Sequence, residues 1–226
     1  KDIQGYPRNN LAAINVDKLV LPKPYVPAVC TFHHQIISCI ALIALLSGCA
    51  LTTVETSGTP LARPLCASAE SRLPVAIYWM PQWRPDQKEP AAREALAQRG
   101  IEDFIARHPC LTLTALERLP AGAGTPSDAA LLRQAATLNP PPERVVLIVV
   151  RELGPRLLIG LPMGVEGGTE AVIEMRVLNP AATEPLADAR TQWRNGGKFV
   201  IKGVRSLDAD MSAALTAALM PASASR

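Results

Sequence analysis

Hydrophobic residues along the chain form one continuous run and then a series of periodic segments. The run extends from Ile36 to Leu46 and is interrupted by one serine and one cysteine. Its eleven residues are too few to cross a bilayer core, which takes about 20. They do suit the apolar region of a secretory signal, and Ser47 and Gly48 are small residues of the kind found before a cleavage site. The sequence therefore predicts export; the alternative is a buried strand or helix that ends in Ser-Gly-Cys.

The periodic segments after residue 72 predict an α/β domain. Strands are expected where apolar residues alternate or run together, and helices where they recur at helical spacing between capping residues and prolines. The expected strands are 73–80, 110–119, 144–151, 170–178, 186–194 and 198–202, and the expected helices are 91–107, a short helix opening at 125–128, and 206–219. This gives the order β-α-β-α-β-β-β-β-α, a mixed sheet with helices packed on it and an antiparallel C-terminal meander.

Two connecting segments are predicted from their glycine content. Residues 152–168 are a Gly/Pro-rich excursion containing a short apolar stretch, Leu157–Leu161. Asn195-Gly196-Gly197 is a strong hairpin signal between the last two expected strands.

The domain organisation follows from these segments. Residues 1–49 are predicted to be an upstream segment and signal peptide, and residues 50–72, small, polar and interrupted by proline, a flexible tether. Residues 73–221 form the single α/β domain, and 222–226 are a tail.

Charge and cysteine usage narrow the function classes. The formal net charge is +3, and +1 for the residues after Gly48, which gives no indication of nucleic-acid binding. Of five cysteines, Cys30 and Cys39 belong to the signal and Cys49 follows its small residues. Cys66 and Cys110 are an even pair in an exported chain, so a disulfide between them is expected; two unpaired thiols are the alternative.

Residues with catalytic potential are sparse. His108 is the one histidine after Cys49 and is expected to cap the helix before Pro109. Neither a nucleophile motif nor a set of zinc ligands is present, so we predict no catalytic residue, metal or cofactor. The carboxylates of Glu166, Glu170 and Glu174 are read as solvated, with a catalytic pair as the less favoured alternative.

Aromatic and basic residues gather around the expected hairpin. Trp193, Arg194, Lys198 and Phe199 combine side chains that favour the membrane–water interface with side chains attracted to phospholipid headgroups. We predict that they contact a membrane. The alternative is an ordinary cross-strand aromatic pair covering a sheet face.

Leu46-Ser47-Gly48-Cys49 closely resembles the lipobox of bacterial lipoproteins. The resemblance implies cleavage before Cys49 and attachment of diacylglycerol to its sulfur. Leu51, rather than Asp, stands second after Cys49, which in enteric bacteria implies sorting to the outer membrane.

Several further stretches resemble the PelC family of outer-membrane lipoproteins of Pel exopolysaccharide export. They are 151–155, 166–170, 193–197, 201–203 and the closing helix 207–219. The element order is also similar to the wider group that includes the curli-secretion lipoprotein, LpoB and the TolB N-terminal domain.

The PelC resemblance implies a ring-shaped homo-oligomer at the periplasmic face of the outer membrane, with Trp193 dipping into the bilayer. An acidic ring surface would guide a cationic polysaccharide to an outer-membrane export porin. The rivals are a monomeric envelope lipoprotein that activates or tethers a peptidoglycan synthase or ABC transporter, and a periplasmic hydrolase that uses the Glu166–Glu174 region.

Overall fold

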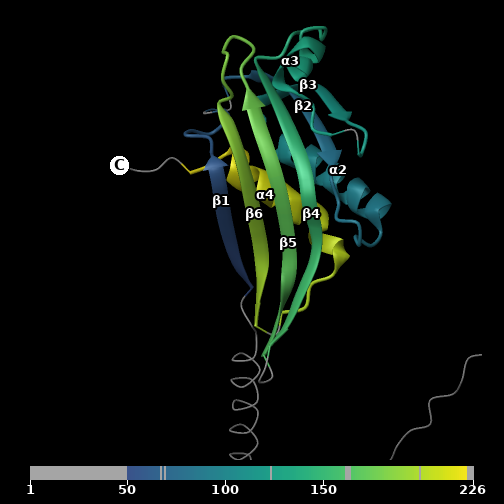
Figure 1. Ribbon diagram of the computed structural model, residues 1–226. Coiled ribbons are helices and arrows are strands. Elements are labelled where there is room, and N and C mark those ends of the chain that lie inside the picture. The colour runs from purple at the N-terminus through teal and green to yellow at the C-terminus, as the bar shows by residue number, and fades with distance from the viewer. Residues whose placement is uncertain are drawn as a thin grey trace, which may run out of the picture. The chain divides into compact units, whose positions relative to one another are not determined.

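A six-stranded sheet forms the centre of the computed structural model, which describes residues 50–222 except 67, 69, 123, 161–163 and 199 (Figure 1). The strands are β1 Leu51–Thr59, β2 Leu73–Pro81, β3 Leu111–Arg118, β4 Arg144–Gly160, β5 Gly164–Leu178 and β6 Ala187–Lys198. The helices are α2 Pro90–Arg107, α3 Asp128–Ala135 and α4 Leu207–Leu219, with a 3-10 turn, η1 Val204–Ser206, before α4.

The sheet is mixed, with strand order β1-β6-β5-β4-β2-β3. β2 lies parallel to β3 and β4, while β4, β5, β6 and β1 pair antiparallel with one another. The predicted α/β class, mixed sheet and antiparallel meander are confirmed. The observed order, β-β-α-β-α-β-β-β-α, has one strand more at its start and one strand fewer before the last helix than expected.

Helices cover the two faces of the sheet unequally. α2 and α4 pack together on one face, over a core that includes Ile77, Ile148 and Ile173. α3 covers part of the other face through Leu131 and Ala135, which join residues of β2 and β4. Because α3 has eight residues, it leaves the β5–β6 half of that face uncovered by any described helix (Figure 1).

The prediction of a flexible tether is wrong for Leu51–Thr59, which form β1. This strand pairs along its whole length with β6, from Leu51 opposite Gly196 to Thr59 opposite Asp188. All nine residues are exposed, so the strand is held by backbone pairing at the sheet edge rather than by burial of apolar side chains. A strand held by backbone pairing alone needs no alternation of apolar side chains. The polar composition of Leu51–Thr59 therefore resembled that of a linker.

The predicted hairpin at Asn195-Gly196-Gly197 and the return strand 198–202 are also wrong. β6 continues through Lys198, with Gly196 opposite Gly168 and Gly197 opposite Gly167 on β5. A Cβ atom on Gly168 would clash with the Asn195 carbonyl and the Gly196 Cα. These glycines allow two strand backbones to approach closely. Close backbone approach, like a turn, is a common reason for glycine in or beside a strand.

The predicted excursion at 152–168 is the distal half of a long hairpin. β4 continues to Gly160 and β5 starts at Gly164, with Gly160 opposite Gly164 in register. A β-bulge between Val150 and Glu152 interrupts β4. Beyond the bulge, the β4–β5 hairpin carries the apolar stretch that begins at Leu157.

Gly100 provides a test of the helix packing. It lies in α2 where α4 passes, and a Cβ atom there would stand 2.5 Å from Met211 Cβ and 2.6 Å from the Asp208 carbonyl oxygen. Helix propensity alone favours Gly→Ala by about 1 kcal/mol. We expect Gly100→Ala instead to lower the free energy of unfolding by about 1–3 kcal/mol, because overpacking separates the helices. Urea unfolding measures the effect.

Ala95→Gly, at an exposed position of the same helix, is the matched control and reports helix propensity alone. A Gly100→Ala variant as stable as the unmodified protein would contradict the close α2–α4 contact.

Candidate functional site

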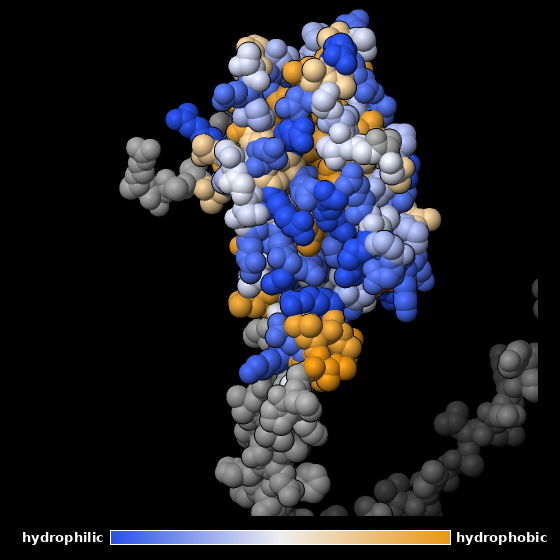
Figure 2. Space-filling view, viewed as in Figure 1, coloured by the Kyte–Doolittle hydropathy of each residue, from blue (hydrophilic) through white to orange (hydrophobic). Residues whose placement is uncertain are grey.

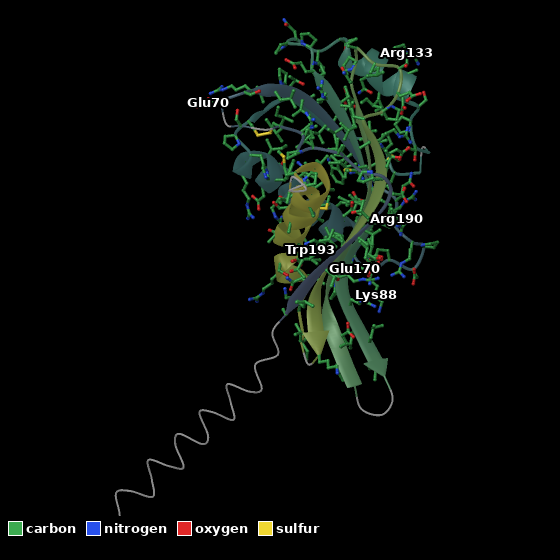
Figure 3. The ribbon with its side chains drawn as sticks, turned by 90° about the vertical axis from the view of Figure 1, so that its left-hand side faces the viewer. Glu70, Lys88, Arg133, Glu170, Arg190 and Trp193 are labelled. Atoms are coloured by element: carbon green, nitrogen blue, oxygen red, sulfur yellow. A yellow bond between two sulfur atoms is a disulfide. The ribbon has the colours of Figure 1, made fainter. Side chains whose placement is uncertain are left out.

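Charged side chains line the sheet face that α3 leaves open, along β5 and β6. Alternation along the strands places Glu170 and Glu174 of β5, and Arg190 and Arg194 of β6, on this face. Figure 2 shows a largely hydrophilic band over these strands, and Figure 3 shows Glu170 and Arg190 on the side of the sheet opposite Trp193. We call this surface, with Arg151 of β4, the polar trough.

Arginine–glutamate pairs organise the polar trough. The Glu174 carboxylate accepts hydrogen bonds from the strands on both sides of β5, from Arg151 Nη2 at 2.6 Å and from Arg190 Nη1 at 3.1 Å. The Glu170 carboxylate accepts hydrogen bonds from Arg194 Nε, at 3.0 Å, and from the Gln192 side-chain amide. Arg151 lies on this face by the same alternation as Leu147 and Val149. The β-bulge adds Glu152 to the face and returns Leu153 to the core, since an extra residue in a strand reverses the alternation of side chains.

The trough is an open hollow rather than a closed pocket. Its central part has a volume of about 520 Å³ and is bounded by the loop after β2, which contributes Gln82, Trp83 and Arg84. Arg84 Nη2 lies 3.1 Å from Glu152 Oε2 across this hollow. Aromatic and paired charged groups along an open channel suit the binding of an extended polar molecule better than the sequestering of a small substrate.

The glutamates proposed for hydrolysis are poorly arranged for it. Glu170 and Glu174 are four residues apart on one strand, which separates their Cα atoms by about 13 Å, and each carboxylate bonds to partners of its own. The carboxylate oxygens of both are also occupied by ion pairs with guanidinium groups. Glu166 lies farther along β5, opposite Lys198 and Leu158.

The predicted membrane-contact group is dispersed in the structure. Trp193 is 5% exposed and belongs to the core beneath α2 and α4, so its predicted contact with a bilayer is wrong for this fold. Its neighbour Arg194 points to the opposite face and pairs with Glu170. Lys198 is exposed at the end of β6, and Phe199 and Cys49 lie outside the described residues.

Cys66 and Cys110 are joined by a disulfide, with their Cα atoms 6.1 Å apart. The bond fastens the segment after β1 to the start of β3. The backbone N–H of Leu65 also donates to the Leu219 carbonyl at 2.8 Å, which ties the same segment to the end of α4. The disulfide and this hydrogen bond together fix the segment after β1 at residues 65 and 66.

His108 ends α2, as its position before Pro109 predicts. Its Nδ1 lies 2.7 Å from the Phe104 carbonyl oxygen, one turn earlier in the helix. Within the described part of the chain, no three His, Cys, Asp or Glu side chains gather in a way that would hold a metal ion. No helix formed by the described residues has the length and apolar character needed to span a membrane.

The polar trough was only partly foreseeable. Alternating charges at 170, 174 and 176 indicated a strand with one solvated face, but the guanidinium partners from β4 and β6 depend on register. Arg151 is the last residue of the expected strand 144–151, and the bulge that adds Glu152 to the same face has no recognisable signature in the sequence.

Comparisons with known proteins give weak likenesses. Neither a family model nor a curated protein matches the chain. Among solved structures, the fold is similar to a PelC dodecamer from Paraburkholderia phytofirmans, with TM-score 0.40 and 11% identity over 76% of this chain and all of that one. A neuraminyllactose-binding hemagglutinin homologue from Helicobacter pylori gives TM-score 0.33 and 9% identity over 72% of this chain and 86% of that one. Similarity at these levels carries no functional conclusion.

Trp193→Ala tests the burial of the indole. Removing a large buried aromatic side chain costs about 3–5 kcal/mol, so we expect a loss of that size in the free energy of unfolding, measured with urea. Trp193→Phe should cost less because it keeps an aromatic ring in the core. An unchanged stability in Trp193→Ala would show that the indole lies at the surface.

The disulfide yields a second prediction. It closes a loop with a sequence separation of 44, for which the chain-entropy relation gives about 4 kcal/mol. We expect Cys66→Ser together with Cys110→Ser to lower the free energy of unfolding by about 2–4 kcal/mol, and dithiothreitol to lower the melting temperature of the unmodified protein but not of the double variant. Equal sensitivity of both proteins to dithiothreitol would contradict the bond.

Proposed function

We propose that the protein is a lipid-anchored lipoprotein at the periplasmic face of the outer membrane and a non-catalytic accessory subunit of Pel-type exopolysaccharide export, working as a homo-oligomeric ring. The observation that carries the proposal is the sequence Leu46-Ser47-Gly48-Cys49 placed one residue before β1. Lipid on Cys49 would hold the domain close to the bilayer, because only Ala50 separates the lipidated residue from the sheet.

The polar trough supports a role in handling an extended polar chain. Saccharides offer many hydroxyl groups and weakly polar ring faces, and the trough offers Arg, Glu and Gln side chains beside the indole of Trp83. Its charges are paired across strands, so the trough favours hydrogen bonding over attraction of one strongly charged ligand. We assign the exported polysaccharide to this face as its partner. The outer-membrane porin is the component of the export pathway that would receive the polysaccharide next.

The sheet edges support self-association. β1 and β3 are the outermost strands, and no described strand pairs with the outer side of either. Exposed edges present backbone donors and acceptors that readily pair with another chain. Copies of this protein placed side by side on a membrane could join through these edges.

A monomeric envelope lipoprotein that activates or tethers a peptidoglycan synthase or an ABC transporter is the second candidate. The same anchor would serve it, and oligomeric state separates the two. A periplasmic hydrolase is the third candidate and is less favoured because the carboxylates of Glu170 and Glu174 are paired with guanidinium groups.

Metabolic labelling with radioactive palmitate tests the anchor. In bacteria that express the full chain, we expect label on the unmodified protein and complete loss of label in Cys49→Ser. Cys39→Ser is the matched control and should retain the label, because Cys39 lies within the signal. Label persisting in Cys49→Ser would contradict the anchor.

Light scattering of the lipidated protein in detergent then measures its mass. A single mass that is a whole-number multiple of the monomer mass supports the ring. A monomer mass at all concentrations would contradict the ring and favour the monomeric lipoprotein that tethers or activates another machine.

A further inference from the structure

The most exposed large apolar side chains of the described residues gather at one end of the sheet. Ile201 is 86% exposed, Ile159 79% and Leu51 69%. Leu157 and Leu158 are 58% and 45% exposed at the same end, and Figure 2 shows an apolar patch there, below the hydrophilic band. We call Leu157, Leu158 and Ile159, at the end of the β4–β5 hairpin, the apolar tip.

Strand register shows that these residues share one end of the molecule. Leu51 lies opposite Gly196, which lies opposite Gly168, which lies opposite Arg156. The apolar tip follows Arg156 directly and extends beyond the level of Leu51. The loop after β6 comes to the same place, since the Val200 carbonyl and the Leu157 side chain both adjoin Gly167.

The close approach of β5 and β6 at their glycines shapes this end. Gly167 and Gly168 face Gly197 and Gly196, so these four positions carry no side chain on either face of the sheet. The narrow ribbon that results has no described helix over it (Figure 1). Its aliphatic side chains therefore lack a core of their own, and exposed apolar groups concentrated in this way mark contact surfaces.

The apolar tip lies beside the point where the anchor would enter. Ala50 connects Cys49 to Leu51 at the first residue of β1, at the same end of the sheet as the tip. A diacylglyceryl group on Cys49 would hold this end, and not the opposite end, against the bilayer.

Basic side chains lie beside the apolar tip and just above it. Lys198 ends β6 and is exposed, Arg156 precedes the tip on β4, and the Lys202 ammonium donates to the Asn195 side chain. Lys198 lies opposite Glu166, which lies opposite Leu158, so this pair stands at the level of the tip, while Arg156 and Lys202 lie above it. Apolar residues followed by long basic ones match the change from acyl chains to phosphate headgroups across a membrane interface.

We propose that the apolar tip inserts into the inner leaflet of the outer membrane beside the lipid on Cys49, as a second membrane contact that fixes the orientation of the domain. The inference rests on the proposed anchor. With two points of contact, the sheet stands on the bilayer with its strands directed away from the membrane and the polar trough open to the side. A single flexible acyl anchor would not fix that orientation.

Quenching by brominated phospholipids tests the insertion. The full-length lipidated protein carrying Ile159→Trp is reconstituted into vesicles of phosphatidylethanolamine and phosphatidylglycerol, with and without bromine on the acyl chains. Bromine quenches tryptophan only within the hydrocarbon region, so we expect loss of the emission added by Trp at 159. Ile159 is 79% exposed, so this substitution leaves the packing of the core unchanged.

Leu186→Trp is the matched control. Leu186 is 39% exposed and precedes β6 at the opposite end of the sheet, so its added emission should be insensitive to bromine. Loss of emission for Ile159→Trp alone supports the inference. Equal insensitivity of both variants in vesicle-bound protein would overturn it while leaving the anchor intact, and would point to a tip covered by a second copy or facing water. Protein absent from the vesicles would overturn the anchor and the inference together.

Discussion

The pairing of β6 between β5 and β1 is the interaction on which the rest of the structure depends. It sets which residues of β6 face the helices and which face the open side, so Trp193 enters the core while Arg194 reaches Glu170. A shift of one residue would exchange these two side chains and place a guanidinium group in the core. The same pairing attaches β1, and with it the place where the segment carrying the lipobox-like sequence meets the domain.

Two chemically different surfaces follow from this strand pairing, at different levels along the strands. In the middle of β4, β5 and β6, alternation produces the polar trough, and the bulge in β4 adds Glu152 to it. Farther along, opposed glycines replace side chains, and the hairpin ends in aliphatic residues without a core. The polar trough and the apolar tip thus occupy successive segments of the same strands, with Arg156 and Lys202 between them.

Sequence reasoning succeeded where apolar periodicity and local capping agreed. Ser127 accepts from the Ala130 N–H and starts α3, and the β-branched run after Arg144 is the buried β4. It failed where a strand is specified by backbone pairing alone: Leu51–Thr59 bury nothing, and Gly196-Gly197 carry the chemistry of a turn as well as that of close strand packing. Prediction of the polar trough would have required the register between strands, which depends on partner segments far apart in the sequence. Trp193 was misplaced because an indole suits both a core and a membrane interface.

The central claim is that the chain reaches the domain through an ordered edge strand and not through a free tether. Amide hydrogen exchange of the full-length lipidated protein, resolved by residue, measures this directly. The structure predicts an alternating pattern within Leu51–Thr59, in which the amides that face β6 are protected and those that face outward exchange rapidly. Rapid exchange of every amide in this segment would contradict the claim and, with it, the position beside the apolar tip that we propose for the anchor.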